Sequence, residues 1–223
     1  MPRVSVIIPA YCDTSQKVDW LLECIESVVK QDAEIIIYDD GSPSNVTIDL
    51  MMFGNRVRYY RGDQVGVSHA RNEAVKLATC ELILPLDCDD KLHPNAISRL
   101  LSVWDGETPV YPDVAKFGAE NVPHYALLDF SCDHILKHVG FSSVNVLHRK
   151  KQWESIGGWN EELDFFEDGE YNARLFSKYC GKRFPEPLVM YRIHDSQRTV
   201  KYKKQSAYYA NKIMQMIRRL EMP

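Results

Sequence analysis

The chain has 223 residues, of which 45% are hydrophobic and 26% charged, and its formal net charge at pH 7 is −4. These values exclude an intrinsically disordered chain, a collagen-like repeat and a coiled-coil rod, and the charge gives no global basic field for binding nucleic acid. A chain of this length can bury a full hydrophobic core in one large domain.

Strand-like and helix-like patterns alternate over the first hundred residues. The strand-like segments are rich in β-branched and aliphatic residues, and they lie at 4–8, 35–38, 57–60 and 82–86. The helix-like segments repeat their apolar residues with a helical period, and they lie at 16–30, near 45–53, at 67–78 and from residue 94 onward. This alternation predicts an α/β fold with a mostly parallel central sheet and helices on both faces. Right-handed crossovers then bring the carboxyl ends of the strands to one edge, where ligands bind.

The second half of the chain is less regular. Residues 105–140 contain three prolines and few periodic stretches, which predicts loops and short strands. After them we expect a strand, a helix, a second strand and a C-terminal helix, at 143–147, 169–180, 188–193 and 203–220. Seven basic residues lie between Arg198 and Arg219, a run that is usually a solvated face.

The six cysteines are scattered and show no metal-type spacing, so we expect free thiols in a reducing compartment and neither zinc nor disulfides. The longest apolar runs are far shorter than a membrane span requires. The first residues show no signal-peptide pattern. The sequence therefore predicts a cytoplasmic protein without an integral membrane segment.

Acidic residues follow two of the predicted strands. Asp87, Asp89 and Asp90 lie within one short turn, where their carboxylates repel one another unless a cation neutralises them. A hard divalent cation is commonly held by one or two such carboxylates. Asp39 and Asp40 end another strand. An acidic turn and an Asx-turn are the structural alternatives, but two such turns on one sheet edge favour a binding site.

A third acidic pair, Glu167 and Asp168, follows two phenylalanines at the start of a predicted helix. A partly desolvated carboxylate there would have a pKa suited to accepting a proton, and helix capping is the structural alternative. Among cationic residues, Arg71 is either a surface charge or reaches the same edge from its helix. Arg192 and His194 have the spacing that faces one side of a strand, where they can hold a diphosphate or complete a metal shell.

Seven motifs follow one another along the chain, and the ordered set is far more specific than any single motif. They are VSVIIPAY at 4–11, IYDDGS at 37–42, GVSHARN at 66–72, LDCDD at 86–90, GGWNEEL at 157–163, ED at 167–168 and YRIH at 191–194. With these motifs the chain resembles the family-two inverting glycosyltransferases of the Rossmann-like GT-A fold, over most of its length.

The resemblance implies inverting transfer of a sugar from a nucleotide diphosphate sugar, usually a UDP-sugar, with Mn²⁺ or Mg²⁺ as cofactor. It divides the chain into a nucleotide-binding half at 1–100, an acceptor-binding and catalytic half at 101–198 and a helical tail at 199–223. The implied nucleotide-binding residues are Pro9, Tyr11, Asp39, Asp40, Arg71, Asp87 and Arg192. Asp40 is preferred over Asp39 as the partner of the uracil. Asp89 and His194 would bind the metal. Asp168 would be the general base, and Glu167, the second catalytic residue, would be its neighbour or a contact of the acceptor.

The sequence departs from the family pattern in two places. Cys12 stands where the family usually has Asn, and the segment between Asp90 and Glu167, which usually shapes the acceptor site, is short. A glycan or a lipid-linked saccharide is the family's common acceptor class. The basic C-terminal helix leaves a hydroxylated base in DNA as an alternative acceptor, whose binding would weaken steeply with salt.

Three other functions are alternatives to glycosyl transfer. A nucleotidyltransferase that makes nucleotide sugars usually has a Gly-rich basic loop after the first strand, and none is present here. Asp-X-Asp phosphatases carry their aspartates after the first strand rather than the fourth. A nucleotide-sugar-binding protein without activity would not need Asp89, Asp168 and His194 together.

Overall fold

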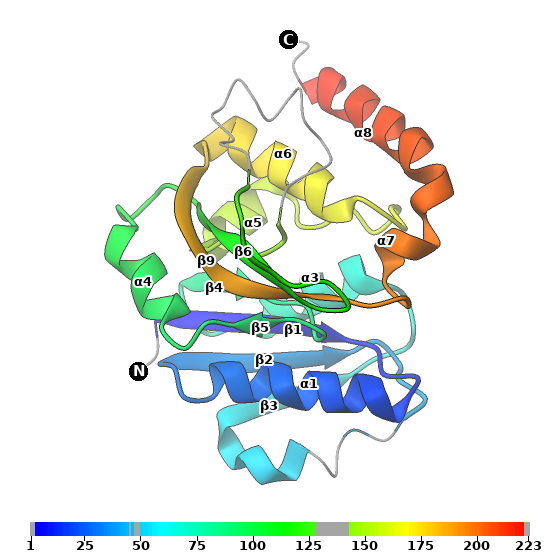
Figure 1. The fold of residues 1–223 in the computed structure, drawn as a ribbon. Coiled ribbons are helices and arrows are strands. Elements are labelled where there is room, and N and C mark those ends of the chain that lie inside the picture. The colour runs from blue at the N-terminus through cyan, green and yellow to red at the C-terminus, as the bar shows by residue number, and fades with distance from the viewer. Residues whose placement is uncertain (1–2, 45, 47–49, 128–142, 221–223) are drawn as a thin grey trace.

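The computed structural model describes residues 3–44, 46, 50–127 and 143–220 (Figure 1). Its main sheet has the strand order β3-β2-β1-β4-β8, formed by β1 (Val4–Ala10), β2 (Ala33–Asp39), β3 (Val57–Arg61), β4 (Leu82–Pro85) and β8 (His148–Arg149). The first four strands are parallel and β8 is antiparallel to β4. Every residue of β1 is buried. The mostly parallel sheet expected from the alternating patterns is therefore confirmed.

Helices cover both faces of this sheet, as expected. Helix α1 (Ser15–Val28) lies in front of the sheet in Figure 1 and α3 (Val67–Leu77) lies behind it, packed on β1 and β2. Thr14 caps α1 by accepting a hydrogen bond from the amide of Lys17 at 3.3 Å, which satisfies one of the free donors at a helix start. Helix α4 (Ala96–Val103) begins after residue 94. The helix expected near 45–53 is described only in part, as the 3₁₀-helix η1 (Met51–Arg56).

A second sheet lies above the main one in Figure 1. Its strand order is β5-β9-β6-β7, formed by β5 (Lys91–Leu92), β9 (Lys182–Ile193), β6 (Val110–Gly118) and β7 (Val122–Tyr125). The nine-residue strand β6 corrects the expectation of loops and short strands in this region. The β6–β9 register shifts around Pro112 and Asp113, and such irregularities let a strand accommodate proline.

The remaining elements follow β8. They are α5 (Lys150–Ile156), α6 (Glu167–Tyr179), α7 (Arg198–Lys201), the 3₁₀-helix η3 (Lys203–Gln205) and α8 (Ser206–Leu220). The strand expected at 143–147 is not formed, and only Leu147 makes a bridge, to Val110. Asn145 instead donates its side-chain amide to the carbonyl of Pro85 at 2.9 Å, so a side chain rather than a backbone ladder ties this segment to β4.

The described cysteines and helices bear on the expected free thiols and on the expected lack of a membrane segment. Cys12, Cys24, Cys80 and Cys88 are free, but Cys180, directly after α6, is disulfide-bonded. The expectation of free thiols is therefore wrong at Cys180, while Cys132 lies outside the described residues. Among the helices that the structure describes, none has the length and apolar character to span a bilayer.

Candidate active site

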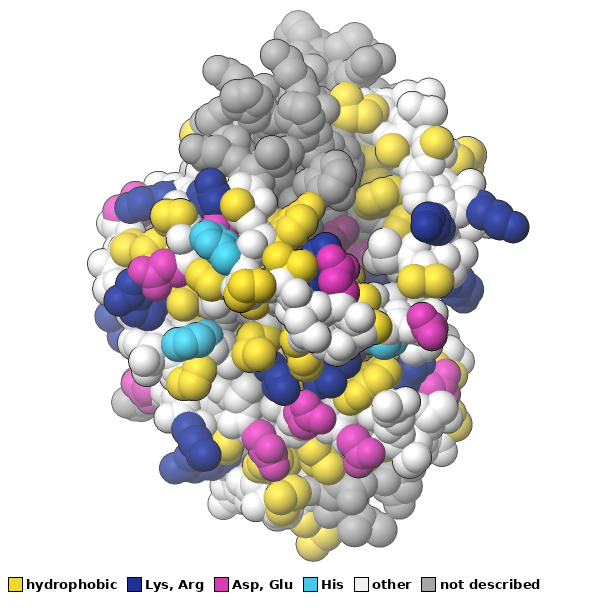
Figure 2. All heavy atoms as spheres, viewed as in Figure 1, with side chains coloured by type: hydrophobic (Ala, Val, Ile, Leu, Met, Phe, Trp, Pro, Cys, Tyr) yellow, Lys and Arg dark blue, Asp and Glu magenta, His cyan; other side chains and the backbone are white. Residues whose placement is uncertain are grey.

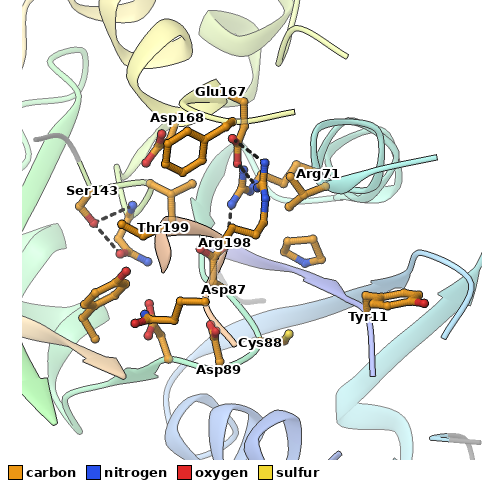
Figure 3. Close-up of a pocket in the computed structure, with 18 of the residues that line it drawn as sticks. Tyr11, Arg71, Asp87, Cys88, Asp89, Ser143, Glu167, Asp168, Arg198 and Thr199 are labelled. Carbon is orange, nitrogen blue, oxygen red and sulfur yellow. Dashed lines mark hydrogen bonds and ion pairs between the residues drawn. The ribbon is translucent and has the colours of Figure 1, made fainter. Parts of the chain in front are cut away.

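A cavity of about 620 Å³ opens at the carboxyl ends of β1 and β4 and is lined by residues from both sheets (Figure 3). All of the site residues predicted from the sequence line it except Asp39 and Arg192; those that do are Pro9, Tyr11, Asp40, Arg71, Asp87, Asp89, Glu167, Asp168 and His194. These residues are separated by up to 185 positions in the chain. The sheet-edge rule predicted those that lie at the ends of main-sheet strands, whereas Arg71, Glu167, Asp168 and His194 reach the cavity from α3, α6 and the end of β9.

The turn after β4 forms an acidic cluster. Oxygens of Asp87, Asp89 and Asp90 lie within 4.8 Å of one another. Nε2 of His194 lies 3.0 Å from Oδ2 of Asp89, and the ring of Trp20 packs 4.4 Å from that of His194. Burial, and then the charges of Asp89 and Asp87, raise the pKa of Asp90 well above its ordinary value. Closely spaced carboxylates beside an imidazole fit a hard divalent cation such as Mn²⁺ or Mg²⁺.

The two neighbouring aspartates at the end of β2 lie in different surroundings. Asp40 lines the cavity, and its carboxylate accepts the backbone amides of Val65 at 2.8 Å and Gly66 at 3.0 Å. Asp39 is fully buried and accepts from the amide of Ser42 at 2.7 Å and from Arg61 at 2.9 Å. The inclusion of Asp39 among the nucleotide-binding residues is therefore corrected, because its carboxylate is used within the fold.

A chain of ion pairs crosses the cavity wall. Arg71 is 2% exposed and donates to Asp87 at 2.6 Å and to Glu167 at 2.8 Å. Burial by itself would lower the pKa of Arg71, but Asp87 and Glu167 raise it, so the guanidinium stays charged. The two ion pairs of Arg71 join the acidic cluster to the start of α6, and its expected contact with the nucleotide stays a prediction.

Glu167 and Asp168 form the first turn of α6, after Phe166 in a left-handed conformation with φ of 61°. Burial would raise the pKa of Glu167, but Arg198 and Arg71 outweigh it and lower the pKa. Burial, and then the charge of Glu167, raise the pKa of Asp168 to about 7. The two adjacent carboxylates are therefore distinct at neutral pH: Glu167 is ionised and paired, whereas Asp168 can take up or release a proton.

Arg192 lies beside the acidic cluster. Its side chain donates to Glu23 at 2.9 Å and to the backbone carbonyl of Asp89 at 2.7 Å, and it packs over the rings of Trp20 and Phe117. It is not among the described residues that line the cavity. Arg192 therefore contacts the acidic cluster without lining the cavity, and its expected contact with the diphosphate stays a prediction.

Arg198 lines the cavity and was missed as a site residue. Figure 3 shows Arg198 and Arg71 converging on Glu167, with Asp168 beside it. The sequence offered only one indication, since Arg198 opens the basic run of the C-terminal segment.

Comparison with known proteins gives the family. The model for glycosyl transferase family 2 matches residues 5–138, which is more than half of the chain. The chain belongs to this family. The match includes Asp40, Asp87 and Asp89 but ends before Asp168 and His194, so the place of these last two residues in the site rests on the geometry of the cavity.

Relatives of this family 2 domain include larger synthases. Chondroitin synthase of Pasteurella multocida is 28% identical over 193 residues, covering 78% of this chain and 19% of the synthase. The PGL/p-HBAD biosynthesis glycosyltransferase of Mycobacterium bovis is 28% identical over 188 residues, covering 79% of this chain and 70% of that protein. The chain thus spans about a fifth of the length of the Pasteurella synthases that it matches.

Solved structures agree on the fold. The crystal structure of residues 1–349 of S. aureus TarS has a TM-score of 0.73 at 17% identity, covering 97% of this chain and 64% of that one. The GT-A fold implied by the sequence motifs is confirmed.

Proposed function

We propose that this domain transfers a sugar from a UDP-sugar to an acceptor hydroxyl in one displacement that inverts the anomeric carbon. The observation that carries the proposal is that Asp168, with a pKa raised to about 7, lines the same cavity as the acidic cluster. TarS structures in complex with UDP-GlcNAc and with UDP support a UDP-sugar as the donor class.

The donor would lie along the edge of the main sheet. Tyr11 and Pro9 would flank the uracil, Asp40 would accept a hydrogen bond from it, and Asp87 would face the ribose or the sugar. Asp89 and His194 would hold a divalent cation, Mn²⁺ or Mg²⁺. Such an ion, when bound, stabilises the negative charge that develops on a departing diphosphate.

Asp168 would act on the acceptor. Its carboxylate would take the proton of the acceptor hydroxyl as the hydroxyl oxygen forms a bond to the anomeric carbon and the bond from that carbon to the UDP oxygen breaks. Glu167 cannot replace it as a base, because its paired carboxylate keeps a lowered pKa. Because the transfer is one displacement without a covalent intermediate, the configuration of the anomeric carbon is inverted.

A glycan or a lipid-linked saccharide is the acceptor class we favour. Relatives of this domain are named chondroitin synthase and hyaluronan synthase, which supports a glycan acceptor. The DNA alternative loses support because Arg198, the first residue of the basic run, is paired with Glu167. On the face drawn in Figure 2, basic and acidic side chains are interspersed rather than gathered into one basic patch. We propose the cytoplasm as the compartment, where a disulfide such as that of Cys180 is unusual, and cell fractionation would test this.

The experiment is a panel of nucleotide sugars with saccharide acceptors and with a DNA that contains hydroxymethylated bases, each with Mn²⁺, with Mg²⁺ and with EDTA. Release of UDP together with a product of inverted configuration in NMR supports the proposal. Release of pyrophosphate from a nucleoside triphosphate and a sugar phosphate would instead identify a nucleotidyltransferase, and a retained configuration would exclude the single displacement.

A further inference from the structure

Two guanidinium groups share one buried carboxylate at the start of α6. Arg198, on α7, contacts both oxygens of Glu167, with Nη1 at 2.8 Å from Oε1 and Nη2 at 3.1 Å from Oε2. The same Arg198 also donates to the carbonyl of Asp164. Arg71 donates to Oε1 of Glu167 at 2.8 Å. A bidentate ion pair of this kind fixes the orientation of the carboxylate and also balances its negative charge.

The charges around Asp168 come from four elements. Glu167 adjoins it on α6 and Asp87 faces it from the turn after β4, and both disfavour its ionised form. Arg71 on α3 and Arg198 on α7 carry the opposite charge and favour that form. Three carboxylates therefore meet two guanidinium groups, so the group carries a net charge of −1 when Asp168 is ionised and would carry −2 without Arg198.

We propose that Arg198 is a positioning residue for the base: it fixes Glu167 and balances its charge, so that Asp168 is left as the carboxylate able to accept a proton from the acceptor. The inference rests on the proposed function, in which Asp168 is that base. Arg198 follows His194 by only four residues, so one short segment provides both a metal-binding candidate and the cation that supports the base.

The test is the pH dependence of kcat in Arg198→Gln, Arg198→Lys and Lys201→Gln. Removing one positive charge beside three carboxylates should move the midpoint of the rising limb upward by about one pH unit in Arg198→Gln. Activity at pH 7 should then fall severalfold and recover above pH 9. Arg198→Lys keeps the charge without the planar fork, so its midpoint should stay near that of the wild type. Lys201 is an exposed residue of the same helix, and its loss controls for net charge.

Glu167→Gln provides the opposite perturbation. It removes a negative charge beside Asp168 while Arg71 and Arg198 remain, so the midpoint should move downward by about one pH unit. This variant, with Arg198→Lys, keeps the test decisive even where thermal unfolding shows that Arg198→Gln is not folded. A fall in kcat by the same factor at every pH in Arg198→Gln, with an unmoved midpoint in Glu167→Gln, would overturn the inference.

A titration without substrate separates this inference from the proposed function. The carboxyl carbon of Asp168 can be followed by NMR in protein labelled with ¹³C-aspartate and assigned with Asp168→Asn. If the wild type transfers no sugar, the proposed function fails, yet the titration still reports whether Arg198 and Glu167 move the Asp168 midpoint in opposite directions. An Asp168 midpoint equal to that of the wild type in both Arg198→Gln and Glu167→Gln would contradict the role given to Arg198.

Discussion

Asp168 should give sugar transfer a pH dependence close to neutrality. Burial, and then the adjacent charge of Glu167, raise its pKa to about 7. A general base acts only in its ionised form, and a group with this pKa is about 9% ionised at pH 6 and about 91% ionised at pH 8. We therefore expect kcat to rise about tenfold between pH 6 and pH 8, with a midpoint near 7.

The assay is UDP release at saturating donor, metal and acceptor across this range, with Asp168→Asn as the comparison. Asparagine has the same shape but cannot accept the proton, so kcat should fall by about 10²- to 10⁴-fold. UDP affinity should be unchanged, since Asp168 is not part of the acidic cluster. A flat profile between pH 6 and 8, or near-normal turnover in Asp168→Asn, would refute the assignment of the base.

The same carboxyl should affect folding stability with a definite sign. Its pKa is raised in the folded state, so the folded protein binds this proton more tightly than the unfolded chain does. The resulting stability is fully present below about pH 4 and is lost as the pH rises through about 7. Asp168→Asn should therefore raise Tm relative to the wild type at pH 8 more than at pH 4, and a difference independent of pH would contradict the shift.

The remaining predictions concern the metal, the nucleobase and the core. Asp89→Ala should lose about tenfold or more in UDP affinity measured with Mn²⁺ by calorimetry, and equal affinity with and without EDTA in the wild type would contradict the metal site. Tyr11→Ala should weaken UDP binding about tenfold through lost base stacking, with little change in kcat, and an unchanged Kd would remove Tyr11 from the nucleotide site. Trp159 is stacked on Tyr171 with ring centroids 4.0 Å apart, and it is only 2% exposed. Trp159→Ala should lower the free energy of unfolding by about 3–5 kcal/mol, and a urea midpoint equal to that of the wild type would contradict this.

The sheet and most of its edge could be predicted because their determinants are local. Continuous β-branched runs identify buried parallel strands, and topology then gathers the residues that follow them. Asp40 and Asp89 reach one cavity for this reason, whereas Asp168 reaches it from the first turn of α6. Strand β6 could not be predicted from local pattern, since the buried Asp113 within it is held by partners that lie 11 to 70 residues later, namely His124, the amide of Leu127 and Arg183.

The errors at the site have similar causes. Asp39 was included because nothing in its own segment shows that Arg61, its register partner on β3, holds its carboxylate. Arg192 and His194 both contact Trp20 and Asp89, in keeping with strand alternation, but only His194 lines the cavity. Arg198 was missed because its partner, Glu167, lies 31 residues earlier and only the folded chain brings them together.

A crystal structure of the protein with UDP and Mn²⁺ tests the central claim most directly. We expect an ion bonded to Asp89, His194 and the diphosphate, a uracil against Tyr11, and the carboxyl of Asp168 open to the part of the cavity that UDP leaves free. An ion away from Asp89, or a diphosphate lying against Asp168, would contradict it.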